Sequence, residues 1–75
     1  MQKSSANSNF PSRLKAARIA CGLTQQKAAD SFSITLRGYC KWEAGQSEPS
    51  LSTVALIART LGVSADWLLG LTDER

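Results

Sequence analysis

The sequence predicts an all-α fold, a compact domain of five short helices. A chain of 75 residues has room for one small domain, since domains usually need roughly 50 to 200 residues. No stretch alternates apolar and polar residues for long, and no Asn-Gly or Asp-Gly pair marks a hairpin turn. Apolar residues instead recur at steps of three and four between capping residues. We expect a disordered arm at residues 1–8, the folded domain at 9–71 and a polar tail at 72–75.

The first two helices are marked by caps at their ends. The first should follow Asn9, a suitable cap, with Pro11 in its opening turn, where a missing N–H does no harm. Gly22 suits the left-handed residue just past its end. Its apolar face consists of Phe10, Leu14, Ala17 and Cys21. Thr24 should cap a second helix that runs to about residue 32. This helix should face inward through Ala28, Ala29 and Phe32.

The fourth and fifth helices follow the same rules. Ser50 should cap the fourth helix, and Gly62 should end it. Its apolar stripe consists of Leu51, Val54, Ile57, Ala58 and Leu61. A last short helix is expected at residues 65–69, before Gly70. None of these helices is long enough to be stable alone in water, so their apolar faces must pack on one another.

The composition excludes several classes of protein. Hydrophobic residues make up 43% of the chain, but no apolar run approaches the ~18 residues that span a bilayer, and no signal-peptide pattern opens the chain. We therefore expect a soluble, cytoplasmic protein. The chain has no His, and Cys21 and Cys40 alone cannot make a four-ligand zinc site. We expect no enzyme activity, no cofactor and no metal.

The charge is unevenly distributed along the chain, whose formal net charge is +3. Residues 1–41 hold seven Lys or Arg against one Asp, a net charge of +6. Residues 42–75 hold two Arg against five acidic residues, a net charge of −3. A basic half of this kind can face a polyanion, although small proteins also acquire uneven surface charge by chance.

The third helix and its link to the second indicate a binding surface. Thr35 should cap a helix at residues 35–44. Only Ser33-Ile34 join it to the second helix, and so short a link typically gives the steep crossing of a helix-turn-helix. Tyr39 and Trp42 should face the core. The opposite face would then expose Leu36, Arg37 and Lys41 about one turn apart, where a DNA major groove can receive them together.

A series of short motifs runs through the chain. They are Gly22-Leu23-Thr24-Gln25, Ala29, Ile34-Thr35, Trp42-Glu43-Ala44-Gly45, Pro49-Ser50-Leu51, Ala58 and Leu61-Gly62-Val63-Ser64-Ala65-Asp66-Trp67-Leu68-Leu69-Gly70. Their order and spacing, over about residues 10–71, resemble the lambda-repressor/Cro type (XRE-like) of helix-turn-helix domain. The resemblance implies a sequence-specific, double-stranded DNA-binding transcriptional regulator, typically a phage-like or bacterial repressor.

The resemblance also implies roles for individual residues. Helix 35–44 would lie in the major groove, where Arg37 or Lys41 could pair with guanine and Leu36 could touch a thymine methyl group. Phosphate contacts would come from Gln25, Thr35, Gln46 and Ser47. Arg18 and Glu43 would form a structural ion pair between the first and third helices.

Three residues depart from the pattern of this family. Gly38 lies in the middle of the recognition helix, where it costs about 0.5–1 kcal/mol relative to Ala; it either lets the backbone approach DNA or softens the helix. Ser33 stands where the family usually has a left-handed Gly. Lys27 replaces the Glu of a capping box, which is unfavourable for the helix dipole but well placed for a phosphate contact.

Solvent exposure alone is the competing explanation for the basic residues. Arg37 and Lys41 can be two solvated charges, although the surrounding motif favours DNA contact. Leu36 fits packing or mere exposure as well as it fits a thymine contact. Arg13 and Lys15 on the first helix fit a solvated face better than phosphate contacts.

The aromatic residues and the cysteines have simpler explanations than a ligand. Trp42 and Trp67 fit core aromatics better than base-stacking platforms, because both fall on apolar stripes. Cys21 fits a buried apolar residue. Cys40 can face solvent and sense oxidation, but no His stands near either thiol to activate it.

The alternative function is a protein-interaction module on the same scaffold. Leucines beyond the needs of one small core could form an apolar patch: Leu56, Leu68, Leu69 and Leu71. Reading DNA also requires a dimer, because two recognition helices must lie about 34 Å apart on a pseudo-palindromic operator. We expect a homodimer through the fifth helix and the C-terminal residues. The patch fits both functions, whereas the basic recognition helix favours DNA.

Overall fold

A computed structural model describes residues 9–75 and contains five helices and no strand in that range. The helices are α1 (Phe10–Ala20), α2 (Gln25–Ser31), α3 (Leu36–Ala44), α4 (Leu51–Leu61) and α5 (Ala65–Leu68). The predicted all-α class is therefore confirmed, and each helix starts or ends within one or two residues of its predicted limits. The arm predicted at residues 1–8 lies outside the described residues.

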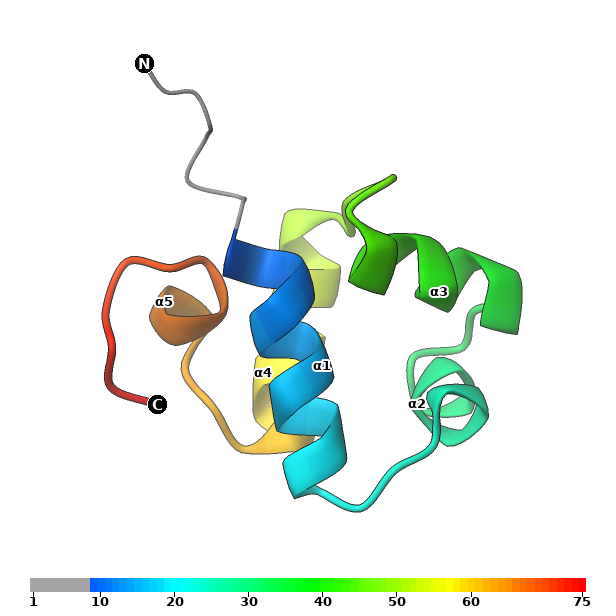
Figure 1. The fold of residues 1–75 in the computed structure, drawn as a ribbon, viewed down its shortest axis with the longest axis horizontal. Helices are drawn as coiled ribbons and strands as arrows, with labels where there is room; N and C mark the ends of the chain where they lie inside the picture. The colour runs from blue at the N-terminus through cyan, green and yellow to red at the C-terminus, as the bar shows by residue number, and fades with distance from the viewer. Residues whose placement is uncertain (1–8) are drawn as a thin grey trace.

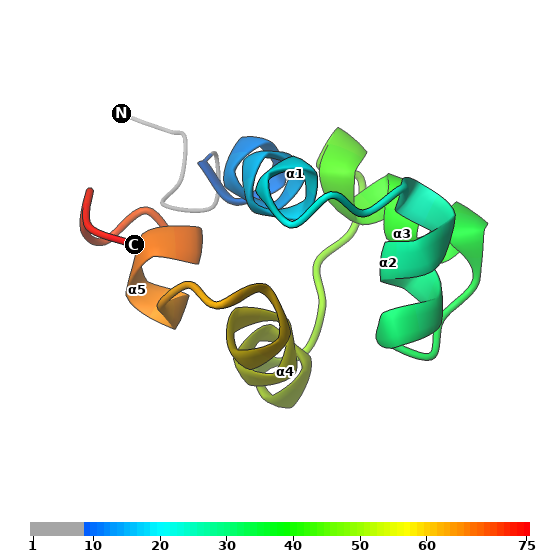
Figure 2. The same cartoon turned by 90° about the horizontal axis from the view of Figure 1, so that it is seen from below.

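The arrangement of the helices separates two ends of the molecule. Figure 1 shows α1 near the centre, with α5 on one side and α2 and α3 together on the other. In Figure 2, which is turned by 90°, α4 lies beneath α1, and α2 and α3 again form the end opposite α5. The helix pair expected to meet DNA therefore lies at one end of the domain, away from α5.

The core is built mostly from the predicted apolar stripes, with Leu68 of α5 added to them. Its fully buried large side chains come from α1, α3, α4 and α5: Leu14, Tyr39, Ile57 and Leu68. Ala28 and Ala29 of α2 are also fully buried, and their small side chains allow α2 to approach α3 closely. Both tryptophans lie in the core as predicted, with Trp42 8% and Trp67 6% exposed.

Three predicted helix caps are confirmed. The side-chain oxygens of Thr24, Thr35 and Ser50 each accept a hydrogen bond from the backbone N–H three residues further on. Asn9 does not act as predicted, because its side chain makes no capping hydrogen bond. Its backbone is already helical (φ −88°, ψ −16°), whereas a capping side chain needs the extended conformation seen at the other caps.

Three apolar residues lie elsewhere than predicted. Cys21 is exposed just past the end of α1 at Ala20, and its thiol donates to the backbone oxygen of Leu61 (3.4 Å). Leu51, expected on the buried stripe of α4, is 85% exposed because it begins the helix beyond the edge of the core. Leu68, expected in a surface patch, is fully buried.

Arg13 holds the C-terminal segment against the rest of the domain, and the expectation of a solvated side chain was wrong. Its Nη1 donates to the backbone oxygens of Trp67 and Thr72, both at 2.6 Å, and its guanidinium lies 5.0 Å from the Trp67 ring centroid. The guanidinium of Arg75 also lies over that ring, at 4.5 Å. Residues 72–75 therefore fold back on α5 instead of extending as a tail.

Lys15 is exposed, as expected.

The turn between α2 and α3 depends on a left-handed residue. Ser33 has φ +58°, and among the described residues it is the one non-glycine residue with positive φ. This conformation lets the chain reverse so that the Ile34 N–H donates to the backbone oxygen of Ala29 (3.0 Å). A Cβ atom makes this backbone conformation costly, by roughly 1–2 kcal/mol.

Replacement of Arg13 by Ala should lower the free energy of unfolding by about 1.5 kcal/mol, because two partly buried carbonyls lose a charged donor. Chemical denaturation monitored by circular dichroism measures the change. The matched control is Lys15→Ala on the exposed face of the same helix, which should change stability by less than about 0.5 kcal/mol. Equal effects of the two substitutions would show that the Arg13 contacts are not formed in solution.

Replacement of Ser33 by Gly should raise the free energy of unfolding by about 0.5 kcal/mol. Relief of the left-handed strain should exceed the larger entropy that Gly gives the unfolded chain. Ser33→Ala is the control, since it removes the hydroxyl but keeps the Cβ atom, and it should bring no gain. A Gly variant no more stable than the Ala variant would contradict the strained turn.

Candidate nucleic-acid interface

The exposed side of α3 forms the recognition face, which we define as Leu36, Arg37 and Lys41. Tyr39 and Trp42 fix the orientation of the helix, because both are buried on its opposite side. Leu36 is 40% exposed, and the side chains of Arg37 and Lys41 are also exposed. Arg37 and Lys41 are four residues apart and so lie one above the other on the helix surface. The structure thus brings the three predicted base-contact residues to one surface.

Gly38 is explained by the cap of its own helix. The Oγ1 atom of Thr35 accepts a hydrogen bond from the Gly38 N–H (3.0 Å). A Cβ atom at position 38 would lie 3.2 Å from that oxygen, which is tighter than ordinary contact. A side chain there would therefore crowd the cap, a reason that the sequence did not reveal.

Four of the predicted phosphate contacts are exposed side chains near the two ends of the helix pair. Lys27 lies in the first turn of α2 and Thr35 caps α3. Gln46 and Ser47 lie in the segment that follows α3. The backbone of Gln46 ends α3 by donating to the carbonyl of Lys41 (2.9 Å). Thr35, Gln46 and Ser47 therefore border the two ends of α3, whereas Lys27 lies on α2.

A buried ion pair joins α1 to α3. The Nε atom of Arg18 donates to Oε2 of Glu43 (2.7 Å), and Nη2 donates to Oε1 (3.3 Å). The remaining terminal nitrogen, Nη1, donates to the backbone oxygen of Leu23 (2.9 Å). Only 10% of the Arg18 side chain and 6% of the Glu43 side chain is exposed. The guanidinium therefore ties α1 to α3 and to the link that leads into α2.

Two more side chains donate to the same carboxylate. The hydroxyl of Tyr39 donates to Oε2 of Glu43, and Nε2 of Gln25 donates to Oε1 (3.1 Å). We call Arg18, Gln25, Tyr39 and Glu43 the Glu43 network. Gln25, predicted as a phosphate contact, is thus already hydrogen-bonded within the protein. The bond from the Tyr39 hydroxyl was not predicted, although the spacing of four residues between Tyr39 and Glu43 on one helix is a usable signal.

The network sets the ionisation of its members. Burial alone would raise the pKa of Glu43, but the hydrogen bonds from Arg18, Tyr39 and Gln25 outweigh it and hold that pKa below its ordinary value. The hydrogen bond to Glu43 raises the pKa of Arg18. Burial and the adjacent carboxylate raise the pKa of Tyr39. Glu43 is therefore ionised, and Arg18 and Tyr39 are protonated, at neutral pH.

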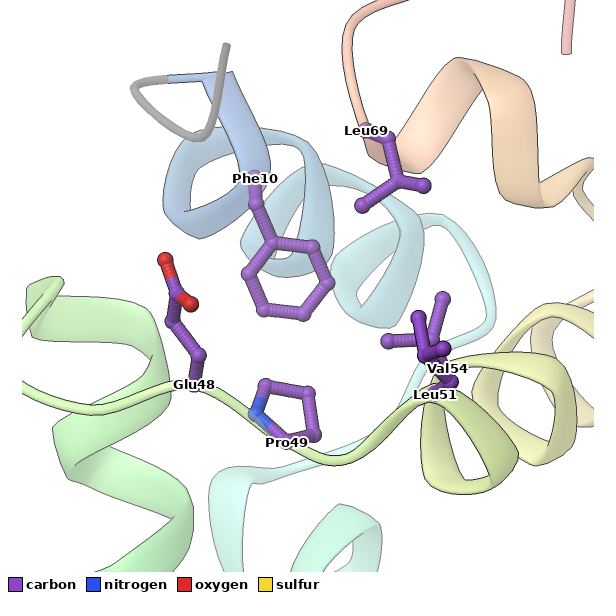
Figure 3. Close-up of a pocket in the computed structure, with 6 residues that line it drawn as sticks. All are labelled: Phe10, Glu48, Pro49, Leu51, Val54 and Leu69. Atoms are coloured by element: carbon purple, nitrogen blue, oxygen red, sulfur yellow. The ribbon is translucent and has the colours of Figure 1, made fainter. Parts of the chain in front are cut away.

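An apolar pocket of about 310 Å³ lies at the α4–α5 side of the domain. Figure 3 shows the Phe10 ring between Pro49, the start of α4 and Leu69 of the α5 end, with Glu48 at the margin. Within residues 9–75, no three or more His, Cys, Asp or Glu side chains gather as a metal site. The described helices are also too short or too polar to cross a membrane.

The sequence profile of the helix-turn-helix family matches residues 14–68. A similar protein is the SPbeta prophage-derived uncharacterized HTH-type transcriptional regulator YonR of Bacillus subtilis, 47% identical over 60 residues that cover 80% of this chain and 56% of that protein. The cryptic phage CTXphi transcriptional repressor RstR of Vibrio cholerae is 39% identical over 64 residues, which cover 83% of this chain and 57% of RstR. The chain thus spans a little over half the length of these curated relatives.

Solved structures with the same fold include two regulators of low sequence identity. The DNA-binding domain of the P22 C2 repressor superposes with a TM-score of 0.77 at 20% identity, covering 92% of this chain and 93% of that domain. The clp gene regulator ClgR of Corynebacterium glutamicum superposes with a TM-score of 0.79, also at 20% identity, covering 91% of this chain and 72% of ClgR. The predicted fold and the predicted family resemblance are both confirmed.

Replacement of Glu43 by Gln should lower the free energy of unfolding at pH 7 by about 3 kcal/mol, since it leaves the Arg18 charge buried without its partner. The difference from the wild type should shrink as the pH falls. Glu43 has a lowered pKa when folded, so its contribution is complete above the unfolded value of about 4.3 and is lost as the pH falls through the folded value. Denaturation curves between pH 7 and pH 2.5 measure this.

The control for this pH dependence is Glu74→Gln, which changes an exposed carboxylate near the C-terminus. It should retain nearly the wild-type slope of stability against pH. A constant difference between Glu43→Gln and the wild type across the whole range would contradict a lowered Glu43 pKa.

Proposed function

The chain belongs to the helix-turn-helix family, and on that premise we propose that it is a sequence-specific, double-stranded DNA-binding transcriptional regulator that acts in the cytoplasm on the nucleoid. The observation that carries the proposal is the recognition face, where two basic side chains lie one helical turn apart on a helix held by buried aromatics. Relatives named as transcriptional regulators and as a phage repressor favour repression as its action.

The recognition face has the chemistry to read base edges. Arg37 is suited to a bidentate hydrogen bond with O6 and N7 of guanine, and Lys41 can serve the same acceptors. Leu36, which is 40% exposed, offers an apolar surface to a thymine methyl group. All three would enter the major groove together if α3 lies along it.

The phosphate contacts would set the position of α3 in the groove. Lys27, Thr35, Gln46 and Ser47 are exposed on α2 and at the two ends of α3, which suits contacts to the two strands that border a groove. Lys27 is the charged member and should supply most of their salt-dependent affinity. Gln25 is half-buried, and its amide would act from within the Glu43 network.

The distribution of charge supports DNA as the partner. Two basic side chains of the N-terminal half, Arg13 and Arg18, are engaged with carbonyl and carboxylate groups inside the domain. Lys27, Arg37 and Lys41 are exposed on α2 and α3, where Asp30 is the one exposed carboxylate. The end of the molecule formed by α2 and α3 is therefore positive, as a surface that attracts a polyanion must be.

We further propose that the protein binds a pseudo-palindromic operator as a homodimer through the region of α5 and the C-terminal residues. Leu71 is 66% exposed beside α5, and Leu51 is 85% exposed at the rim of the apolar pocket. Exposed leucines that join into one apolar patch favour contact with another protein surface. The same leucines also support the second candidate, a protein-interaction module that does not read DNA.

Selection of bound sites from random DNA duplexes at low salt tests the function, and the molecular mass in solution with and without the enriched duplex tests the assembly. We expect one enriched sequence with two related half-sites about 10 base pairs apart from centre to centre, bound by a dimer. If no sequence were enriched, the interaction module would become the better explanation.

Replacement of Arg37 by Ala should lower affinity for the enriched site by about 1–3 kcal/mol and relax sequence choice at one base pair per half-site. Replacement of Lys27 by Ala should instead weaken binding to all sequences and reduce the slope of log affinity against log salt by about 1 per subunit. Titration at several salt concentrations, with specific and scrambled duplexes, measures both effects.

The matched control is Arg59→Ala, which removes an exposed positive charge from α4, outside the α2–α3 pair. It should leave both the sequence choice and the salt slope nearly unchanged. The assignment of the interface to α2 and α3 would be wrong if Arg59→Ala changed binding as much as Lys27→Ala.

A further inference from the structure

We propose that Tyr39 is a positioning residue for the DNA contact of Gln25, and that it acts through the carboxylate of Glu43. The inference rests on the proposed function, since it concerns how this domain would hold a phosphate. Gln25 begins α2, whereas Tyr39 and Glu43 lie on α3. The three side chains meet at the contact between these two helices.

The amide of Gln25 is held in one orientation. Its Nε2 donates to Oε1 of Glu43 (3.1 Å), and its Oε1 accepts from the Cys40 thiol (3.6 Å). Rotation of the amide by 180° would place its oxygen against the carboxylate, where two acceptors would repel each other. An amide nitrogen carries two N–H groups, so one remains after the bond to Glu43. That second N–H is the group suited to a phosphate oxygen, and its direction is set by Glu43.

Glu43 can orient Gln25 only while the carboxylate itself is fixed. Arg18 holds both of its oxygens, and the Tyr39 hydroxyl gives Oε2 a second donor. Without that hydroxyl, Oε2 keeps a single partner, and the carboxylate can turn toward Arg18. The acceptor for Gln25 would then move, and the amide would lose its fixed direction.

Packing alone does not require a hydroxyl at position 39. The Tyr39 side chain is completely buried, and its ring packs against Phe32 and Trp42 with centroid separations of 6.3 Å and 5.9 Å. Phe would supply the same ring, and a buried hydroxyl is costly unless it is hydrogen-bonded. Its hydrogen bond goes to Glu43. The hydroxyl therefore matters through that carboxylate, which is also the partner of Gln25.

The test is a double-mutant cycle on the whole chain with Tyr39→Phe, Gln25→Ala and the combined variant, using the DNA duplex enriched in the selection. Each single substitution should weaken binding about tenfold, the loss expected for one hydrogen bond to a charged group. The combined variant should bind within about twofold of Gln25→Ala, because both substitutions remove the same contact. The proposal would be overturned if the losses of DNA affinity in the two single variants multiplied in the combined variant. It would also be overturned if Tyr39→Phe bound DNA as the wild type does.

A control separates positioning from lost stability. Ile57→Val changes a fully buried core residue of α4, outside the Glu43 network, and typically costs about as much stability as one hydrogen bond. It should bind the duplex as the wild type does at a temperature where both are folded. A loss of DNA affinity by Ile57→Val equal to that of Tyr39→Phe would assign the effect to stability and overturn the proposal.

A measurement without DNA keeps this proposal distinct from the proposed function. In ¹⁵N-labelled wild-type protein, the side-chain amide of Gln25 should give two well-separated proton signals, and these should converge in Tyr39→Phe. If those signals did not change, the positioning role would be overturned even though the wild type bound DNA. If the wild type bound no duplex, the proposed function would be wrong. The phosphate contact of Gln25 would then be wrong as well, whatever the amide signals showed.

Discussion

The rest of the domain depends on one buried charge pair, that of Arg18 and Glu43. Two charges withdrawn from water are costly unless every donor and acceptor is satisfied, so they restrict how their surroundings can pack. Each of the three nitrogens of the Arg18 guanidinium donates a hydrogen bond, two of them to the oxygens of Glu43 and one to the carbonyl of Leu23. These bonds relate α1, the link before α2, and α3 to one another. Hydrogen bonds are directional and apolar contacts are not, so this set of bonds restricts the orientation of α3 in a way that the hydrophobic core alone does not.

The sequence was sufficient for features that depend on near neighbours. Helix caps such as Thr24 and Thr35, and the burial of Tyr39 and Trp42, follow from spacing along one helix. The contacts of Arg13 could not be foreseen in this way, because its acceptors lie more than 50 residues further along the chain. The cap predicted at Asn9 was wrong. Asn is a common capping residue, but only the backbone conformation shows whether its side chain can reach the free N–H groups of the helix.

The same distinction, between near and distant neighbours in the sequence, applies to the candidate site. The recognition face follows from the helical period, since residues opposite a buried aromatic pair must face outward. The use of Gln25 and of the Tyr39 hydroxyl depends on how α2 meets α3, which no local pattern specifies. The position of Gly38 within the helix is evident from the sequence. The close contact that a Cβ atom there would make with Thr35 is not, because it depends on the three-dimensional structure. The resemblance to a known family supplied roles for side chains, and the structure supplied their partners.

The two tryptophans are divided between the two ends of the molecule. Trp42 packs beneath the recognition face, close to Phe32 and Tyr39. Trp67 lies beneath the guanidinium groups of Arg13 and Arg75, where the C-terminal segment folds back on α5. Indole emission depends on such surroundings, so a protein with Trp42 changed to Phe would report the docking of the C-terminal segment alone. The domain thus contains a separate optical probe for each of its two ends.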